Sequence, residues 1–136
     1  MLEGIKRDWL DLYWPVVEPW IVSAVRDAGS LWTAADCRQM LNDRKLQMWV
    51  AWATPDNPSV VVLTEVYDTA AGLTCAIPVV GGSDLAACLE DGLAVIERWA
   101  REQGCVRLRG EGRAGWERVL KPHGWRVVTT QVEKAL

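Results

Sequence analysis

A strand–helix–strand pattern in the second half of the chain constrains the fold more than any other feature. Leu73–Val80 is an apolar run of strand length that ends at Gly81-Gly82. Leucine, isoleucine and alanine then recur at helical spacing over Ser83–Gln103, and Gly104 stands where a left-handed cap ends a helix. A short strand, Cys105–Arg109, follows. Two strands joined by a helix of this length predict a right-handed parallel crossover.

The first half of the chain predicts two helices. The first is expected over Val16–Ala28, with Pro15 and Pro19 in its first turn, where the missing N–H costs nothing. Thr33-Ala34-Ala35-Asp36 has the spacing of a capping box and is expected to open the second helix.

An antiparallel meander is predicted between these helices and the crossover. Leu46–Trp52 alternates in polarity, Val60–Tyr67 is rich in β-branched residues, and short turns join both to Leu73–Val80. A short helix, Trp116–Leu120, and a final strand, Trp125–Val132, complete the pattern. We therefore expect an α+β fold with a mixed sheet.

The domain boundaries follow from the same pattern. Residues 1–12 are polar and mixed, which is typical of a lead-in, and residues 13–136 contain no linker or repeat. A single domain over 13–136 is long enough to bury a core without staples.

Composition limits the partners. A net charge of -3 over 136 residues gives no basic footprint, so non-specific nucleic-acid binding is not expected. No apolar run reaches the roughly 18 residues of a membrane span, and the charged N-terminus is not a signal peptide. We expect no membrane partner and a cytoplasmic location.

Neither a metal nor a disulfide is expected. Cys37, Cys75, Cys88 and Cys105 are scattered through apolar stretches without a C-x-x-C pair, which is typical of buried, reduced thiols. His123 is the one histidine of the chain, which disfavours a histidine-based metal site or a triad.

Tryptophan replaces phenylalanine, since the chain has nine tryptophans and no phenylalanine. Most are expected in the core, because they fall in periodic segments. The alternative is a Trp-rich surface that meets a protein partner.

The order of predicted elements resembles the GCN5-related N-acetyltransferase (GNAT) fold over residues 13–136. Ile96–Cys105 is similar to the end of that family's long helix, and Gly115–Trp125 is similar to its late helix. Gly112–Trp116 also resembles small GNAT-like proteins of tailed phages and prophages. The narrower resemblance implies a viral protein, located in the host cytoplasm or the virion.

The resemblance implies acetyl-CoA or a related acyl-CoA as the donor. In this family the fourth and fifth strands splay apart around the acyl arm, and Pro78, which cannot donate to a ladder, is expected either at that splay or at a plain bulge. The implied cofactor-binding residues lie on the fourth strand and the turn after it: Ile77, Val79, Val80, Gly81, Gly82 and Ser83. Gly82→Val is expected to block CoA and to leave the stability of the free protein unchanged.

Two positions depart from the family pattern. The glycines of its diphosphate loop, which present backbone N–H groups at a helix N-terminus, align with Ala87 and Leu89. Its late-helix tyrosine, which often protonates the leaving thiolate, aligns with Leu120. Tyr13 and Tyr67 are the phenols that remain.

Transfer to an amine needs a base and an acceptor site. Glu65, on a half-buried strand face, and Glu111, in the Gly-rich turn after the fifth strand, are the candidate catalytic residues. Arg109, Arg113 and Trp116 are the candidate substrate-binding residues. Alternatively, Arg107 and Arg109 pair with Glu65 or Glu111 at the rim of the sheet.

Two functions remain open. One is an acyltransferase that moves an acyl group from a CoA-type donor to an amine of a small molecule or macromolecule. The other is a non-catalytic GNAT-fold binding protein or virion-associated phage protein, because a fold alone does not choose a function.

Overall fold

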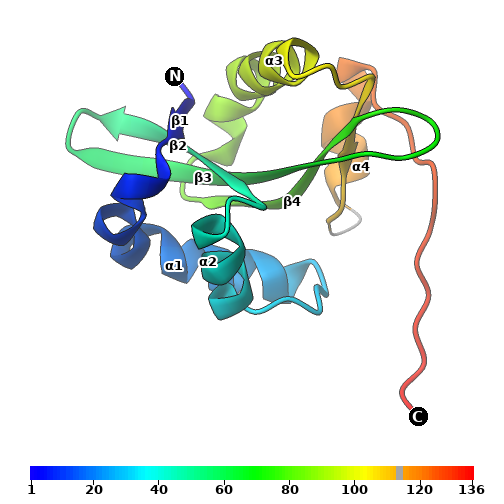
Figure 1. Ribbon diagram of the computed structural model, residues 1–136, viewed down its shortest axis with the longest axis horizontal. Coiled ribbons are helices and arrows are strands. Elements are labelled where there is room, and N and C mark those ends of the chain that lie inside the picture. The colour runs from blue at the N-terminus through cyan, green and yellow to red at the C-terminus, as the bar shows by residue number, and fades with distance from the viewer. Residues whose placement is uncertain (113–114) are drawn as a thin grey trace.

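The computed structural model describes residues 1–112 and 115–136, which form one five-stranded sheet with helices on both faces (Figure 1). The elements are β1 (Glu3–Ile5), η1 (Arg7–Trp9), α1 (Leu10–Asp27), α2 (Ala34–Asn42), β2 (Gln47–Thr54), β3 (Asn57–Tyr67), β4 (Thr74–Gly82), α3 (Leu85–Glu102), β5 (Arg107–Gly110), α4 (Gly115–Leu120) and η2 (Lys121–His123).

The strands follow one another in space in chain order, β1-β2-β3-β4-β5. The first four are antiparallel neighbours, and β5 runs parallel to β4, with α3 as the crossover helix between them. The predicted meander, the parallel crossover and the α+β fold class are therefore confirmed.

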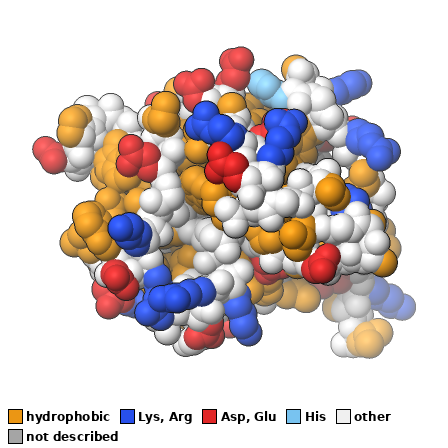
Figure 2. All heavy atoms as spheres, turned by 45° about the horizontal axis from the view of Figure 1, so that its top comes forward, with side chains coloured by type: hydrophobic (Ala, Val, Ile, Leu, Met, Phe, Trp, Pro, Cys, Tyr) orange, Lys and Arg blue, Asp and Glu red, His pale blue; other side chains and the backbone are white. Residues whose placement is uncertain are grey.

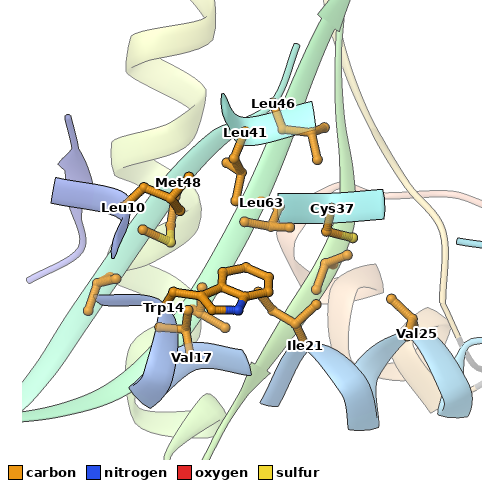
Figure 3. Close-up of a cluster of buried hydrophobic side chains, with 13 residues drawn as sticks. Leu10, Trp14, Val17, Ile21, Val25, Cys37, Leu41, Leu46, Met48 and Leu63 are labelled. Carbon is orange, nitrogen blue, oxygen red and sulfur yellow. The ribbon is translucent and has the colours of Figure 1, made fainter. Parts of the chain in front are cut away.

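Two hydrophobic cores lie on opposite faces of the sheet. The α1/α2 core contains Trp14, Val17 and Ile21 of α1 together with Val61 and Leu63 of β3 (Figure 3). The α3 core lies on the other face, and its members from the sheet and from α3 are Trp49, Ala51, Val60, Val62, Cys75, Ile77, Ile96 and Ala100. Neighbouring residues of β3 thus point into different cores, as the period of a strand requires.

The capping predictions are confirmed. Thr33 accepts from the N–H of Asp36, and the Asp36 carboxylate accepts from the N–H of Thr33, so a complete capping box opens α2. Gly104, with φ +89°, follows α3 in the left-handed conformation that glycine adopts without steric cost.

The start of α1 differs from the prediction. The helix begins at Leu10, so Pro15 and Pro19 lie inside it rather than in its first turn. Each proline removes one intrahelical hydrogen bond, a loss that local sequence rules treat as a helix boundary. The buried side chains of Leu10, Trp14 and Val17 hold the segment against the sheet on both sides of Pro15.

The two ends of the chain also differ from the prediction. Residues 3–5 pair with Val50, Trp49 and Met48 of β2 and add strand β1 to the sheet, where only a lead-in is expected. The final strand, Trp125–Val132, does not form, since residues 125–136 contain neither helix nor strand. As a result β5 lies at the edge of the sheet, whereas the sequence places it in the centre.

Most tryptophans are part of the core, as predicted. Trp14 and Trp49 are buried, Trp9 is exposed at 53 %, and the other six are half-buried. The indole N–H of Trp49 donates to Thr64 Oγ1 at 3.0 Å, so this buried polar group is satisfied.

Candidate functional site

Strand β4 has a β-bulge at its middle. Leu63 pairs with Val79 and Glu65 pairs with Ala76, so two steps along β3 match three along β4. The extra residue falls beside Pro78, which has no N–H to donate to a ladder. The bulge changes the side to which β4 points: Ile77 belongs to the α3 core, and Val79 belongs to the α1/α2 core.

The pairing of β4 with β5 ends at the same place. Ile77 opposite Gly110 is the last pair, whereas β4 continues to Gly82 with β3 as its only partner strand among the described residues. The sequence left a splay and a plain bulge open at Pro78. The structure has both features there, a bulge towards β3 and the end of pairing towards β5.

A polar row crosses three strands just before the bulge. Glu65 pairs with Ala76, and Ala76 pairs with Arg109, so the three side chains share one face of the sheet. The neighbouring row, Val66–Cys75–Leu108, packs into the α3 core, which places Glu65 and Arg109 on the α1/α2 side. Their Cα atoms are two strand spacings apart, about 10 Å. The small Ala76 lies between them.

A second row on this face contains Tyr67, Thr74 and Arg107. Arg107 donates from Nη1 to Thr74 Oγ1 at 2.9 Å and from Nη2 to the carbonyl oxygen of Ala71 at 2.7 Å. The expected pairing of Arg107 with a carboxylate is therefore wrong, because a buried hydroxyl and a turn carbonyl satisfy its guanidinium. Arg109 is exposed and makes no hydrogen bond or ion pair with the described residues.

The remaining predicted residues lie beyond β5. Glu111 is exposed just after the strand, and Trp116 is half-buried in the first turn of α4. The Trp116 ring packs against Gly112, where a Cβ atom would lie 2.7 Å from Trp116 Cδ1. Arg113 lies outside the described residues. Of the predicted set, the structure brings Glu65 and Arg109 onto one face and leaves Glu111 at the adjoining strand end.

The turn between β4 and α3 is occupied by its own packing contacts. Ser83 donates its N–H to the carbonyl oxygen of Ser59 at 2.8 Å. A Cβ atom on Gly82, whose φ is +136°, would lie 2.2 Å from the same oxygen. Ile77, Val79 and Gly81 are buried, so a ligand would meet the backbone of this segment and not those side chains.

The N-terminus of α3 provides other donors. The helix begins at Leu85, and the N–H groups of its first turn have no intrahelical acceptor. Asp84 is the N-cap residue, and its side chain makes no capping hydrogen bond. This terminus can meet an anion through Leu85, Ala86 and Ala87, with a carboxylate beside it.

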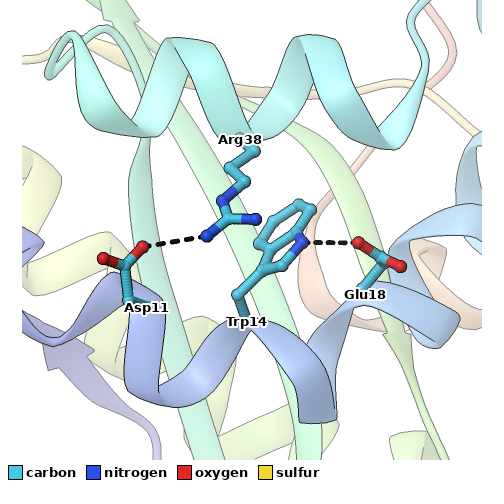
Figure 4. A network of polar contacts seen from close by, with 4 residues as sticks. All are labelled: Asp11, Trp14, Glu18 and Arg38. Atoms are coloured by element: carbon cyan, nitrogen blue, oxygen red, sulfur yellow. Dashed lines mark hydrogen bonds and ion pairs between the residues drawn. The ribbon is translucent and has the colours of Figure 1, made fainter.

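A second polar site, which the sequence analysis missed, lies between α1 and α2. Arg38 donates to Asp11 at 2.9 Å and lies 5.3 Å from the centre of the Trp14 ring, while the Trp14 indole N–H donates to Glu18 (Figure 4). A pocket of about 200 Å³ adjoins Asp11 and Arg38. The four-residue spacing of Trp14 and Glu18 was the available signal, because such residues are neighbours on a helix.

The thiols do not have the properties of nucleophiles. Burial raises the pKa of Cys37 to about 11 and that of Cys75 to about 12, so both are protonated at neutral pH. No cysteine of the described chain is in a disulfide. Among the described residues, no group of three or more His, Cys, Asp or Glu side chains is arranged to hold a metal ion.

The surface has no strong electrostatic field on the face that Figure 2 shows, since acidic and basic side chains alternate over it. None of the described helices is long and apolar enough to cross a bilayer.

Comparison with known proteins gives the fold and little sequence similarity. No protein-family model and no curated protein matches the chain. Three solved structures are similar over nearly its whole length. A ribosomal-protein-alanine N-acetyltransferase from Brucella melitensis biovar Abortus 2308 is 10 % identical, with a TM-score of 0.71 and coverage of 100 % of this chain and 99 % of that one.

The other two structures contain a donor or its product. A predicted acetyltransferase with acetyl-CoA from Clostridium acetobutylicum is 12 % identical, with a TM-score of 0.65 and coverage of 99 % and 95 %. An aminoglycoside N-acetyltransferase in complex with CoA is 11 % identical, with a TM-score of 0.69 and coverage of 100 % and 93 %. The chain has the GNAT fold. At this identity the likeness concerns the fold alone.

Proposed function

We propose that this protein is an acyltransferase that moves an acyl group from a CoA-type thioester to an amine. The observation that carries the proposal is the coincidence of the β4 bulge with the end of β4–β5 pairing at Ile77 and Gly110. It gives β4 a free backbone edge from Pro78 onwards, beside the face that holds Glu65 and Arg109.

The donor would be held by backbone groups. The amide-containing arm of CoA is an extended chain, and it fits the free edge of β4 at Pro78–Val80 in the manner of an added strand. The diphosphate fits the first-turn N–H groups of α3 at Leu85–Ala87. CoA supplies the activated thioester when bound.

Glu65 and Tyr67 supply the acid–base chemistry in this proposal. Their side chains are two residues apart on β3 and lie on the same face. The Glu65 carboxylate takes the proton of the attacking amine, and the Tyr67 phenol gives a proton to the thiolate that leaves. Glu111, at the end of β5, is the alternative base.

Arg109 binds the acceptor. Its guanidinium is exposed on the face of Glu65 and is not engaged by a described residue, so it is available to a carboxylate or phosphate group of the substrate. Arg113 and Trp116 stay in the proposal as further acceptor contacts, because they follow β5 at the same end of the sheet.

A non-catalytic binding role, such as the virion-associated role that the phage resemblance implies, is the second candidate. A specific observation favours it: the N–H of Ser83 is bonded to Ser59, and the family's loop glycines are replaced by Ala87 and Leu89. Asp84 adds a negative charge at the point where the diphosphate would lie.

Thermal unfolding with and without acetyl-CoA separates the two candidates. A ligand at 100 times its Kd stabilises the folded state by about 2.7 kcal/mol, which gives a clear rise in the melting temperature. Release of CoA thiol in the presence of amine acceptors would then establish turnover. No melting shift at millimolar acetyl-CoA would remove the acyltransferase proposal and leave the binding role.

A further inference from the structure

Strand β5 has a free edge. It pairs with β4 on one side, and the described residues provide no strand on its other side. A free edge presents a row of N–H and C=O groups that can pair with another extended segment. Arg107 and Arg109 are the residues of β5 that carry charge, and no proline or bulge protects its edge.

The chain also has an extended segment without a partner. Residues 126–132 are rich in β-branched residues, yet they form neither helix nor strand, and Figure 1 shows the C-terminal segment leading away from the domain. Val127 and Val128 are each 54 % exposed, and Val132 is 93 % exposed. Apolar, strand-forming side chains in this number are unusual on a segment that stays in water.

The point at which the segment leaves the domain is well defined. Gly124, with φ +86°, ends η2 in the left-handed conformation. Trp125 is half-buried in the α3 core and reaches Gly110 at the end of β5, where a Cβ atom would lie 3.5 Å from Trp125 Cζ3. Everything after Trp125 is therefore free to pair, and it starts beside the free edge.

We propose that two copies of this chain exchange residues 126–132, each adding the segment as a strand to the free edge of the other's β5. A symmetric dimer satisfies both unpartnered features of both copies at once, which makes exchange of an identical element a low-cost route to association. The segment spans about 23 Å when extended, enough to cross to a neighbouring β5. The exchanged strand would lie beside Arg109, so the partner copy would complete one wall of the candidate site.

The oligomeric state of the full chain tests the proposal, which does not depend on the proposed acyltransferase function. Light scattering after size exclusion should give a dimer for residues 1–136 and a folded monomer for a chain that ends at Trp125. Amide hydrogen exchange at Arg107–Gly110 should be slow in the dimer and at least tenfold faster in the shortened chain.

A second variant covers the case in which the shortened chain does not fold. Val127→Pro/Val128→Pro removes the N–H of two neighbouring residues, one of which faces β5 in either register, and should also give a monomer. The matched control Glu133→Pro/Lys134→Pro lies outside the segment and should stay dimeric. A monomeric full chain would overturn the proposal, whether its segment is free or folded back on its own β5. A dimer that survives the Val127→Pro/Val128→Pro change would overturn it as well.

Discussion

A Cβ atom on Gly81 of β4 would lie 2.8 Å from the carbonyl oxygen of Trp20 in α1. The helix therefore crosses the strand at a distance that only glycine permits. Gly81 follows the bulge directly, so the contact with Trp20 fixes the free part of β4 against α1. The segment proposed to hold the donor is thus held from the face that carries Glu65.

Gly81→Ala should lower the stability of the protein. The added methyl group meets backbone and not a flexible side chain, and overpacking of this kind costs about 1–3 kcal/mol. Urea unfolding measures the loss. Gly115→Ala is the matched control, since nothing lies within 4 Å of its Cβ position, and an equal loss there would contradict the packing argument.

Gly82→Val should unfold or strongly destabilise the protein even without a ligand. The sequence analysis expects no change, because it assigns Gly82 to an anion-binding turn. In the structure its φ of +136° and the Ser59 carbonyl oxygen, 2.2 Å from a Cβ position, make glycine a packing requirement. A melting temperature within a degree of the wild type would contradict this finding.

What could be predicted from the sequence was local. The capping box at Thr33, the left-handed cap at Gly104 and the crossover between β4 and β5 each depend on residues within about thirty positions of one another. The pairing of residues 3–5 with β2 depends on contacts across more than forty residues and has no local signal.

The site shows the same division. Glu65 and Arg109 could each be selected by residue type, but their position on one face depends on the register of β3, β4 and β5. That register includes a bulge, which the sequence indicated only as a possibility at Pro78. The partners of Arg107 were predicted incorrectly, since its bond to Thr74 requires the same register.

Arg107→Ala and Arg109→Ala should separate structure from function. Arg107 donates to Thr74 and to the Ala71 carbonyl, so its loss should cost about 1–3 kcal/mol of unfolding free energy. Arg109 has no such partner, so its loss should leave unfolding within about 0.5 kcal/mol of the wild type and weaken acceptor binding. Urea unfolding and KM for the acceptor measure the two effects. A stability loss at Arg109 equal to that at Arg107 would contradict the assignment.

Asp84→Asn should tighten the binding of CoA. The carboxylate lies at the N-terminus of α3, where the proposed diphosphate would meet it, and removing one charge there is worth about 0.3–1 kcal/mol, or two- to fivefold in Kd. Binding of pantetheine, which lacks the phosphates, should not change. Asp91→Asn, further along α3, is the control for net charge. Equal effects of the two substitutions would show that the diphosphate does not lie at this terminus.

Alkaline pH should destabilise the protein through its buried thiols. Burial raises the pKa of Cys37 from 9.0 to about 11 and that of Cys75 from 9.0 to about 12. Above pH 9 the unfolded chain loses these protons before the folded one does, so stability that is complete below pH 9 is lost as pH rises towards 11–12. Between pH 8 and 10.5 the loss should be about 1–2 kcal/mol for each thiol. Cys37→Ala/Cys75→Ala should therefore flatten the pH dependence of urea unfolding. Val17→Ala, at an equally buried site, should lower stability alike at both pH values, and a double variant as steep as the wild type would show that these thiols do not cause the loss.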